Sequence, residues 1–160
     1  MRLTWFPTAP SRRTSVVGLA LAIAFVIAFA SETYAQTPQG RMFTSDAGLI
    51  LNYIKADKTA DFEMVMAKLK EALQKSPVAE RKQQAASWKF FKAAEPGPSG
   101  SVLYIFSIDP AVKNVDYTVS KILSEVFPLE IADLYKKFSE AYLQGQVPIN
   151  LTLVSNFGQP

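Results

Sequence analysis

The sequence predicts an α+β domain of the ferredoxin-like kind, a β-α-β-β-α-β sandwich in which a four-stranded antiparallel sheet carries helices on one face. The first observation is the order of periodicities: apolar residues alternate in four short segments and recur at helical spacing in two longer regions between them. The second is that residues 47–55 and 101–108 are mainly apolar on both strand faces, as expected of central strands. The third is an aromatic hairpin, residues 88–109, around which the other elements are expected to wrap.

The N-terminal part of the chain has the features of a cleaved secretory signal. Arg2, Arg12 and Arg13 form a positive region, residues 16–30 are apolar or small, and Thr33-Tyr34-Ala35 resembles a signal-peptidase site. The apolar run is shorter than the roughly 20 residues needed to cross a bilayer, which favours cleavage over a transmembrane anchor.

These features predict the domain organisation. Residues 1–35 are expected to be a cleaved signal peptide, residues 36–46 a flexible leader, and residues 47–157 a single α+β domain. The protein is then exported, periplasmic or secreted, with no stable membrane span after cleavage. Whether export uses the general or the twin-arginine route stays open.

Composition excludes several classes of chemistry and partner. The chain has no cysteine and no histidine, so thiol catalysis, a Ser-His triad and Cys/His zinc sites are impossible. Taking three arginines and one glutamate of the signal from the 17 basic and 14 acidic residues leaves 14 and 13, a net charge of +1. The lysines form no basic stripe, and we expect no nucleic-acid partner.

The first strand and first helix are predicted from residues 47–55 and from a stripe that begins near Ala60. The strand has Leu49, Leu51 and Tyr53 on one face and Ile50, Asn52 and Ile54 on the other. Asp61 and Glu63 fall in the first helical turn, where the helix dipole favours negative charge. The helix stripe, which predicts the face turned to the core, consists of Phe62, Val65, Met66, Leu69 and Leu73.

A short second helical stretch is expected over residues 78–86, after Ser76-Pro77 ends the first helix. The hairpin then supplies strands 87–94 and 101–108, separated by a Pro/Gly-rich break. We group Trp88, Phe90, Tyr104 and Phe106 on one face of the sheet, together with the leucines of the first and last strands.

The C-terminal half is expected to contain a broken helical region and an edge strand. Apolar residues recur at helical spacing over 115–127 and again over 131–142, with Pro128 between them. Gly145 is a plausible cap, and residues 147–154 alternate as a strand in which Pro148 favours an edge position. Helices can cover only one face of this sheet, yet both faces are rich in apolar residues. A homodimer that packs sheet against sheet would cover the other face.

Two short motifs and the order of elements resemble the dimeric α/β-barrel superfamily, which includes the antibiotic-biosynthesis-type monooxygenases. The motifs are Asp61-Phe62-Glu63-Met64-Val65-Met66 at the start of the first helix and Trp88-Lys89-Phe90-Phe91 at the start of the second strand. The similarity covers residues 48–157. It implies a homodimer whose two sheets form a barrel, often with a pocket between sheet and helices.

The resemblance also bears on chemistry. Members that degrade haem use a histidine ligand, which this chain lacks, and cofactor-free oxygenases use a tryptophan and an asparagine, which map onto Trp88 and Asn52. The competing interpretation is that Trp88 packs in the core or dimer interface and Asn52 is a satisfied polar group. We take Asn52, Trp88, Tyr104 and Phe106 as candidate ligand-binding residues.

No catalytic residue, metal site or cofactor is predicted. The chain has no phosphate-binding loop and no dinucleotide-binding glycine motif, and its acidic residues lack calcium-loop spacing. Two hypotheses follow. The first is a non-enzymatic exported homodimer that binds a small apolar ligand or an envelope partner; the second is a cofactor-free monooxygenase-like enzyme. An apolar pocket beside Trp88 with Asn52 pointing into it would favour the enzyme.

Overall fold

The computed structural model describes residues 41–158 of the chain. The expected signal peptide and residues 36–40 lie outside the described residues. Among the described residues, no helix is both long and apolar enough to cross a membrane. The described elements are β1 (Ala47–Ile54), η1 (Ala56–Lys58), α2 (Thr59–Lys75), α3 (Ala79–Ser87), β2 (Trp88–Pro96), η2 (Pro98–Gly100), β3 (Val102–Ile108), α4 (Val119–Val126), α5 (Ile131–Ala141) and β4 (Val147–Leu151).

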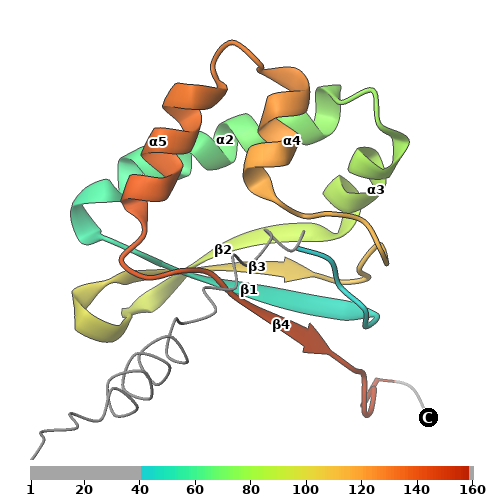
Figure 1. Cartoon of the computed structure of the whole chain (residues 1–160). Coiled ribbons are helices and arrows are strands. Elements are labelled where there is room, and N and C mark those ends of the chain that lie inside the picture. The colour runs from blue at the N-terminus through green and yellow to red at the C-terminus, as the bar shows by residue number, and fades with distance from the viewer. Residues whose placement is uncertain (1–40, 159–160) are drawn as a thin grey trace, which may run out of the picture. The chain divides into compact units, whose positions relative to one another are not determined.

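The fold is α+β, with a four-stranded antiparallel sheet in the order β2-β3-β1-β4. Figure 1 shows α2, α3, α4 and α5 on one side of the sheet and no helix of the described chain on the other. β1 and β3, whose two faces are both apolar, occupy the middle. The predicted stripe of α2 is confirmed, because all five of its residues are buried: Phe62, Val65, Met66, Leu69 and Leu73.

The predicted grouping of side chains on the two sheet faces is wrong. Strand register places Asn52 opposite Tyr104 and Ile50 opposite Phe106, so the isoleucines of β1 share the helix-covered face with the aromatic residues of the hairpin. The leucines of β1 and β4 lie on the opposite face. A shift of one residue exchanges the two faces of a strand, and the sequence cannot fix that shift when both faces are apolar.

Two element boundaries also differ from expectation. The helix expected from residue 115 begins at Val119, because Asp116 Oδ1 accepts hydrogen bonds from the Thr118 backbone N–H at 2.8 Å and hydroxyl at 2.6 Å. The last strand ends at Leu151, since β1 offers no pairing partner beyond Ala47. The break at Pro128 is confirmed, with α4 ending at Val126 and α5 starting at Ile131.

The packed part of the chain starts before β1. Phe43, which the sequence assigns to a flexible leader, is 2% exposed and packs edge-to-face on Tyr117, with ring centroids 5.2 Å apart. The backbone of Arg41 is also held, because its N–H donates to Asp116 Oδ1 at 3.0 Å and its carbonyl accepts from the Tyr117 N–H at 2.8 Å. The contact that Phe43 makes with β1 requires a glycine at position 48.

Replacing Gly48 with alanine is expected to lower the free energy of unfolding by about 1–3 kcal/mol, because the buried Phe43 ring must move to admit a methyl group. A Cβ at position 48 would lie 2.1 to 2.8 Å from three atoms of that ring. Urea denaturation measures the effect. Gly145→Ala is the matched control, since a Cβ there meets nothing within 4 Å. Equal stability of the two variants would show that Phe43 does not pack on Gly48.

Candidate functional site

An apolar groove of about 420 Å³ lies between α2, α3 and the hairpin strands. This size falls in the usual range of roughly 300–1,000 Å³ for small-molecule sites. Its polar residues, Glu63, Lys70 and Gln74, all come from α2. Its apolar residues are Met66, Ala67, Leu69 and Leu73 of α2, Ala85 of α3, Trp88 and Phe90 of β2, and Phe106 of β3. We call this cavity the α2–β2 groove.

Two of the four predicted ligand-binding residues, Trp88 and Phe106, line the groove. The Trp88 ring packs edge-to-face on Phe106 at 5.2 Å and on Tyr117 at 5.3 Å, so it is both groove wall and core. Tyr104 is 1% exposed, and its ring packs against those of Phe62 and Phe90. Tyr104 and Asn52 are absent from the lining of the groove described here.

Asn52 is a fully buried cross-link between the sheet and the segment after α5. Its Nδ2 donates to the carbonyl oxygens of Ile50 at 3.1 Å and Tyr104 at 3.2 Å. Its Oδ1 accepts from the Tyr142 hydroxyl at 2.8 Å and from Gln146 Nε2 at 2.7 Å. These four bonds use both amide hydrogens and both lone pairs of the side chain. Burial of the Tyr142 hydroxyl raises its pKa. The arrangement is that of a satisfied core amide.

One polar cluster borders the groove. The Tyr104 hydroxyl donates to Glu63 Oε1 at 2.5 Å, and Lys92 Nζ donates to the same oxygen at 3.0 Å. Both hydrogen bonds lower the pKa of the Glu63 carboxyl, and the one from Tyr104 has the larger effect. Burial is the main cause of the raised pKa of the Tyr104 hydroxyl. A carboxylate held ionised and a phenol held protonated are poorly matched to proton transfer at neutral pH.

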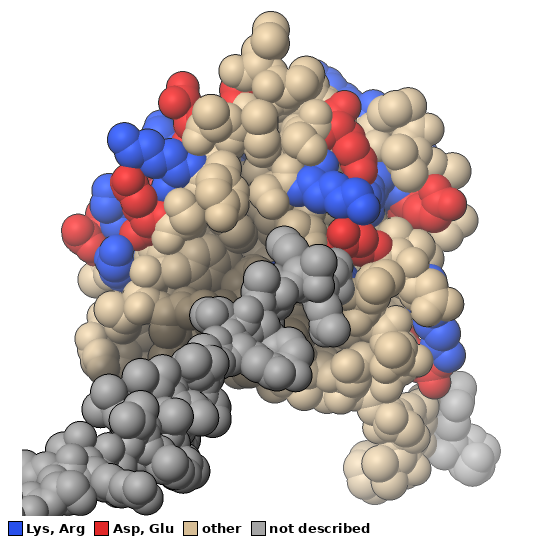
Figure 2. All heavy atoms as spheres, in the orientation of Figure 1, with Lys and Arg blue, Asp and Glu red and all other residues tan. Residues whose placement is uncertain are grey.

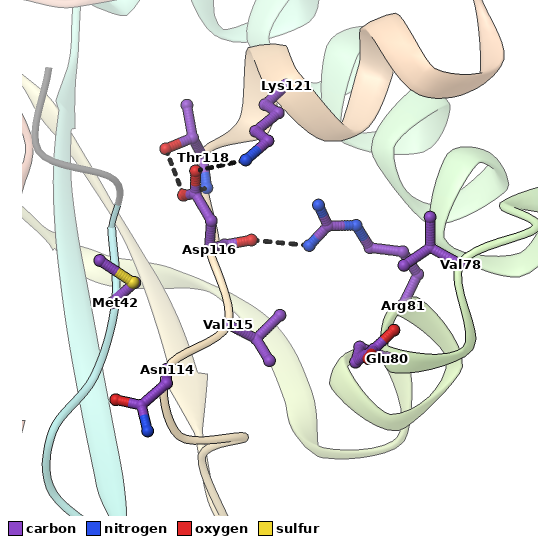
Figure 3. Close-up of a pocket in the computed structure, with 9 residues that line it drawn as sticks. All are labelled: Met42, Val78, Glu80, Arg81, Asn114, Val115, Asp116, Thr118 and Lys121. Carbon is purple, nitrogen blue, oxygen red and sulfur yellow. Dashed lines mark hydrogen bonds and ion pairs between the residues drawn. The ribbon is translucent and has the colours of Figure 1, made fainter.

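A second, more polar cavity of about 770 Å³ lies between α3 and the segment that precedes α4. Figure 3 shows Arg81 reaching across it to the backbone carbonyl of Asp116. The charged residues of its wall are balanced, with Arg81 and Lys121 against Glu80 and Asp116. Lys121 Nζ lies 3.4 Å from Asp116 Oδ2, so its charge also has a partner. The cavity therefore offers no charge excess to attract an ionic ligand.

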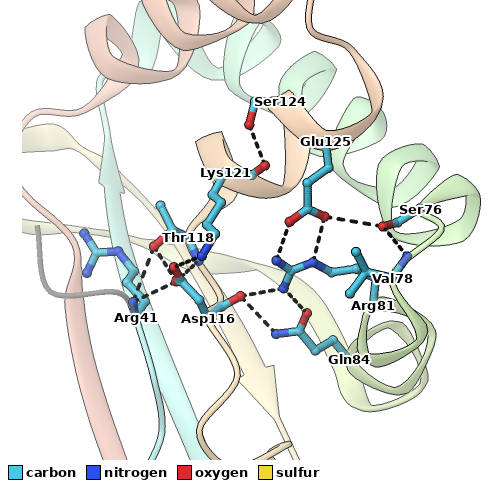
Figure 4. A network of polar contacts seen from close by, with 10 residues as sticks. All are labelled: Arg41, Ser76, Val78, Arg81, Gln84, Asp116, Thr118, Lys121, Ser124 and Glu125. Atoms are coloured by element: carbon cyan, nitrogen blue, oxygen red, sulfur yellow. Dashed lines mark hydrogen bonds and ion pairs between the residues drawn. The ribbon is translucent and has the colours of Figure 1, made fainter.

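Arg81 is the centre of a network that joins α3 to α4 (Figure 4). Its Nε and Nη2 donate to the two carboxylate oxygens of Glu125 at 3.0 and 2.7 Å, and Nη1 donates to Gln84 Oε1 and the Asp116 carbonyl, both at 2.7 Å. The Arg81 side chain is only 4% exposed. No pattern in the sequence indicates this role, because an arginine in a short polar helix resembles an ordinary surface residue.

The sheet face away from the helices carries a continuous apolar surface, which we call the open face. Its most exposed members are Phe91 at 50%, Val147 at 42%, Leu151 at 37% and Ile149 at 36%. Figure 2 shows that most of the charged side chains in view gather over the helices. The apolar residues of the open face are Leu49, Leu51 and Tyr53 of β1, Phe91 of β2, Leu103 and Ile105 of β3, and Val147, Ile149 and Leu151 of β4.

Comparisons of the chain with protein-family models, with curated proteins and with solved structures found no match in any of the three. Within residues 41–158, no group of three or more acidic side chains is arranged to hold a metal ion. The geometry therefore brings together an apolar groove, an apolar sheet face and a structural ion-pair network. The resemblance to the dimeric α/β-barrel superfamily stays a prediction from the sequence.

Proposed function

We propose that the protein is exported and acts outside the cytoplasm as a non-enzymatic homodimer, whose two sheets pack through their open faces and whose α2–β2 groove binds a small apolar ligand. The observation that carries this proposal is the open face. Nine apolar side chains of four strands share one surface without helical cover. Such surfaces on small proteins usually mark an interaction site.

A second copy fits this face better than water or a charged partner. Lys89 and Glu95 are the two charged residues that strand alternation places on the face among the described strands, and both lie on the edge strand β2. A two-fold interface presents the same patch twice, so an apolar patch meets an apolar patch. The strand order, with β1 and β3 in the middle, also supports the ferredoxin-like arrangement and the sheet-to-sheet barrel that the sequence resemblance implies.

The groove supports ligand binding and gives little support to catalysis. Trp88 and Phe106 offer flat apolar walls, and the polar groups are few, as in a typical site for an apolar molecule. The oxygenase hypothesis needs the Asn52 amide beside the ligand. That amide is instead committed to four partners in the core.

Native mass spectrometry of the exported protein tests both parts of the proposal. We expect a dimer that retains a small-molecule mass. Phe91→Glu with Ile149→Glu should weaken the dimer by at least about 100-fold, because charges placed in an apolar interface lose their hydration. The matched control is Leu129→Glu with Tyr135→Glu, which alters two exposed apolar residues outside the sheet, at 99% and 54% exposure. It should leave the dimer unchanged.

Ligand binding is tested with Ala85→Trp, which places an indole in the α2–β2 groove. This variant should remain a dimer and lose the retained mass. A wild-type protein that is monomeric at micromolar concentration would overturn the dimer proposal. Retention of the mass by Ala85→Trp would overturn the assignment of the groove.

A further inference from the structure

The chain beyond β4 carries the most exposed apolar side chains near the sheet. Residues 152–158, which we call the β4 arm, are all exposed, with Leu153 at 73%, Val154 at 95% and Phe157 at 100%. Within the described part of the chain, the hydrogen bond of the arm is internal, from the Gly158 N–H to Asn156 Oδ1. Figure 1 shows the chain after β4 leading away from the helical layer. An isolated domain gains nothing from holding three large apolar groups in water.

The root of the arm is fixed in orientation. Asn150 Oδ1 accepts from the Thr44 N–H at 3.1 Å and the Ser45 N–H at 3.4 Å, which holds that side of β4 against the segment before β1. Val147, Ile149 and Leu151 therefore point to the open face, and the arm begins directly after Leu151. The exposed apolar side chains of the arm therefore start next to the open face.

We propose that the β4 arm of each copy packs against the other copy and forms part of the dimer interface. This inference rests on the proposed sheet-to-sheet dimer and names a further segment of it. A second copy that covers the open face reaches the root of the arm, because the arm starts directly after Leu151, a residue of that face. The described arm contains no charged residue, so it matches the apolar surface that a second copy presents.

The surface area that each part can bury favours a place for the arm in the dimer interface. A stable interface buries about 800 Å² on each partner. The most exposed residues of the open face are between 36% and 50% accessible, so each can bury at most half of its surface there. Leu153, Val154 and Phe157 are 73%, 95% and 100% exposed, so each can bury well over half of its surface. The arm therefore supplies apolar area that the pleated face cannot.

Sedimentation velocity of the exported protein, with and without residues 152–160, tests this role. Removing the arm should raise the dimer dissociation constant about 10- to 100-fold, and full-length Leu153→Asp with Phe157→Asp should do the same. Thr152→Asp with Ser155→Asp adds equal charge to the arm and removes no apolar side chain. This control should change the constant less than about threefold, within the range of a rim charge.

A second readout locates the arm directly. The chain has no cysteine, so Val154→Cys gives one labelling site for a spin label. The label should lose mobility as the protein concentration is raised through the range in which monomer becomes dimer. A wild-type dimer whose constant is unchanged by truncation overturns the arm proposal and leaves the sheet-to-sheet dimer intact. A monomeric wild type overturns both, and equal weakening by the two aspartate pairs overturns the apolar role of the arm.

Discussion

Arg81→Met is expected to lower the free energy of unfolding by roughly 3–5 kcal/mol, because it leaves the partner carboxylate of a largely buried ion pair uncompensated. The Arg81 side chain is 4% exposed and that of Glu125 21% exposed, so water can replace the lost contacts only in part. The substitution also removes the donor to Gln84 and to the Asp116 carbonyl. Urea denaturation at pH 7, followed by circular dichroism, measures the difference.

The pH dependence separates the ion pair from simple packing. The hydrogen bonds from Arg81 lower the pKa of Glu125 in the folded protein. A carboxyl whose folded pKa lies below its unfolded value contributes stability above that unfolded value, near pH 4.3, and loses it as the pH falls through the folded pKa. The gap between wild type and Arg81→Met should therefore shrink below about pH 4.

Two controls sharpen this prediction. Arg81→Met combined with Glu125→Leu should recover part of the loss, since no unpaired charge remains. Lys75→Met breaks the exposed pair with Glu71, whose side chains are 63% and 37% exposed, and should cost less than about 1 kcal/mol. A gap between wild type and Arg81→Met that is the same at pH 7 and pH 3 would show that packing of the long arginine side chain, and not its charge, stabilises the contact between α3 and α4.

The sequence could predict the secondary structure because local patterns carry it. The apolar spacing of α2 permits one buried stripe, and Pro128 can only interrupt a helix, so both were predictable. The sequence could not predict which side chains of neighbouring strands lie on the same face of the sheet. Their placement depends on the register between β1 and β3, where Ile50 meets Phe106, and nothing local in two doubly apolar strands fixes that pairing.

The site was predictable to a similar extent. Trp88 and Phe106 lie in the groove because their strands border α2, which the order of elements already places over the sheet. Asn52 could not be interpreted from sequence, since its partners Tyr142 and Gln146 follow 90 and 94 residues later. The role of Arg81 depends in the same way on Glu125, 44 residues away. The role of a polar residue cannot be predicted from sequence where its hydrogen-bond partners are distant in the chain.

Phe62→Ala is expected to lower the free energy of unfolding by roughly 3–5 kcal/mol, because the residue is fully buried where helices and sheet meet. Its ring centroid lies 5.1 Å from Tyr104, 5.7 Å from Tyr142, 6.0 Å from Phe138 and 6.1 Å from Phe90. Tyr104 belongs to β3, Phe138 to α5 and Phe90 to β2, and Tyr142 directly follows α5. One truncation therefore opens a cavity that three elements and the α5–β4 connection share.

Matched variants decide whether the loss comes from this cavity. Phe62→Leu keeps most of the volume and should cost less than about 2 kcal/mol, whereas Tyr135→Ala, on the same layer but 54% exposed, should stay within about 0.5 kcal/mol. A domain of this size is stable by only about 5–15 kcal/mol, so Phe62→Ala should also lower the urea midpoint markedly. If Phe62→Ala and Tyr135→Ala unfold at the same midpoint, Phe62 does not join the helices to the sheet. The helical layer would then have to be held mainly by the remaining stripe of α2 and by the Arg81 network.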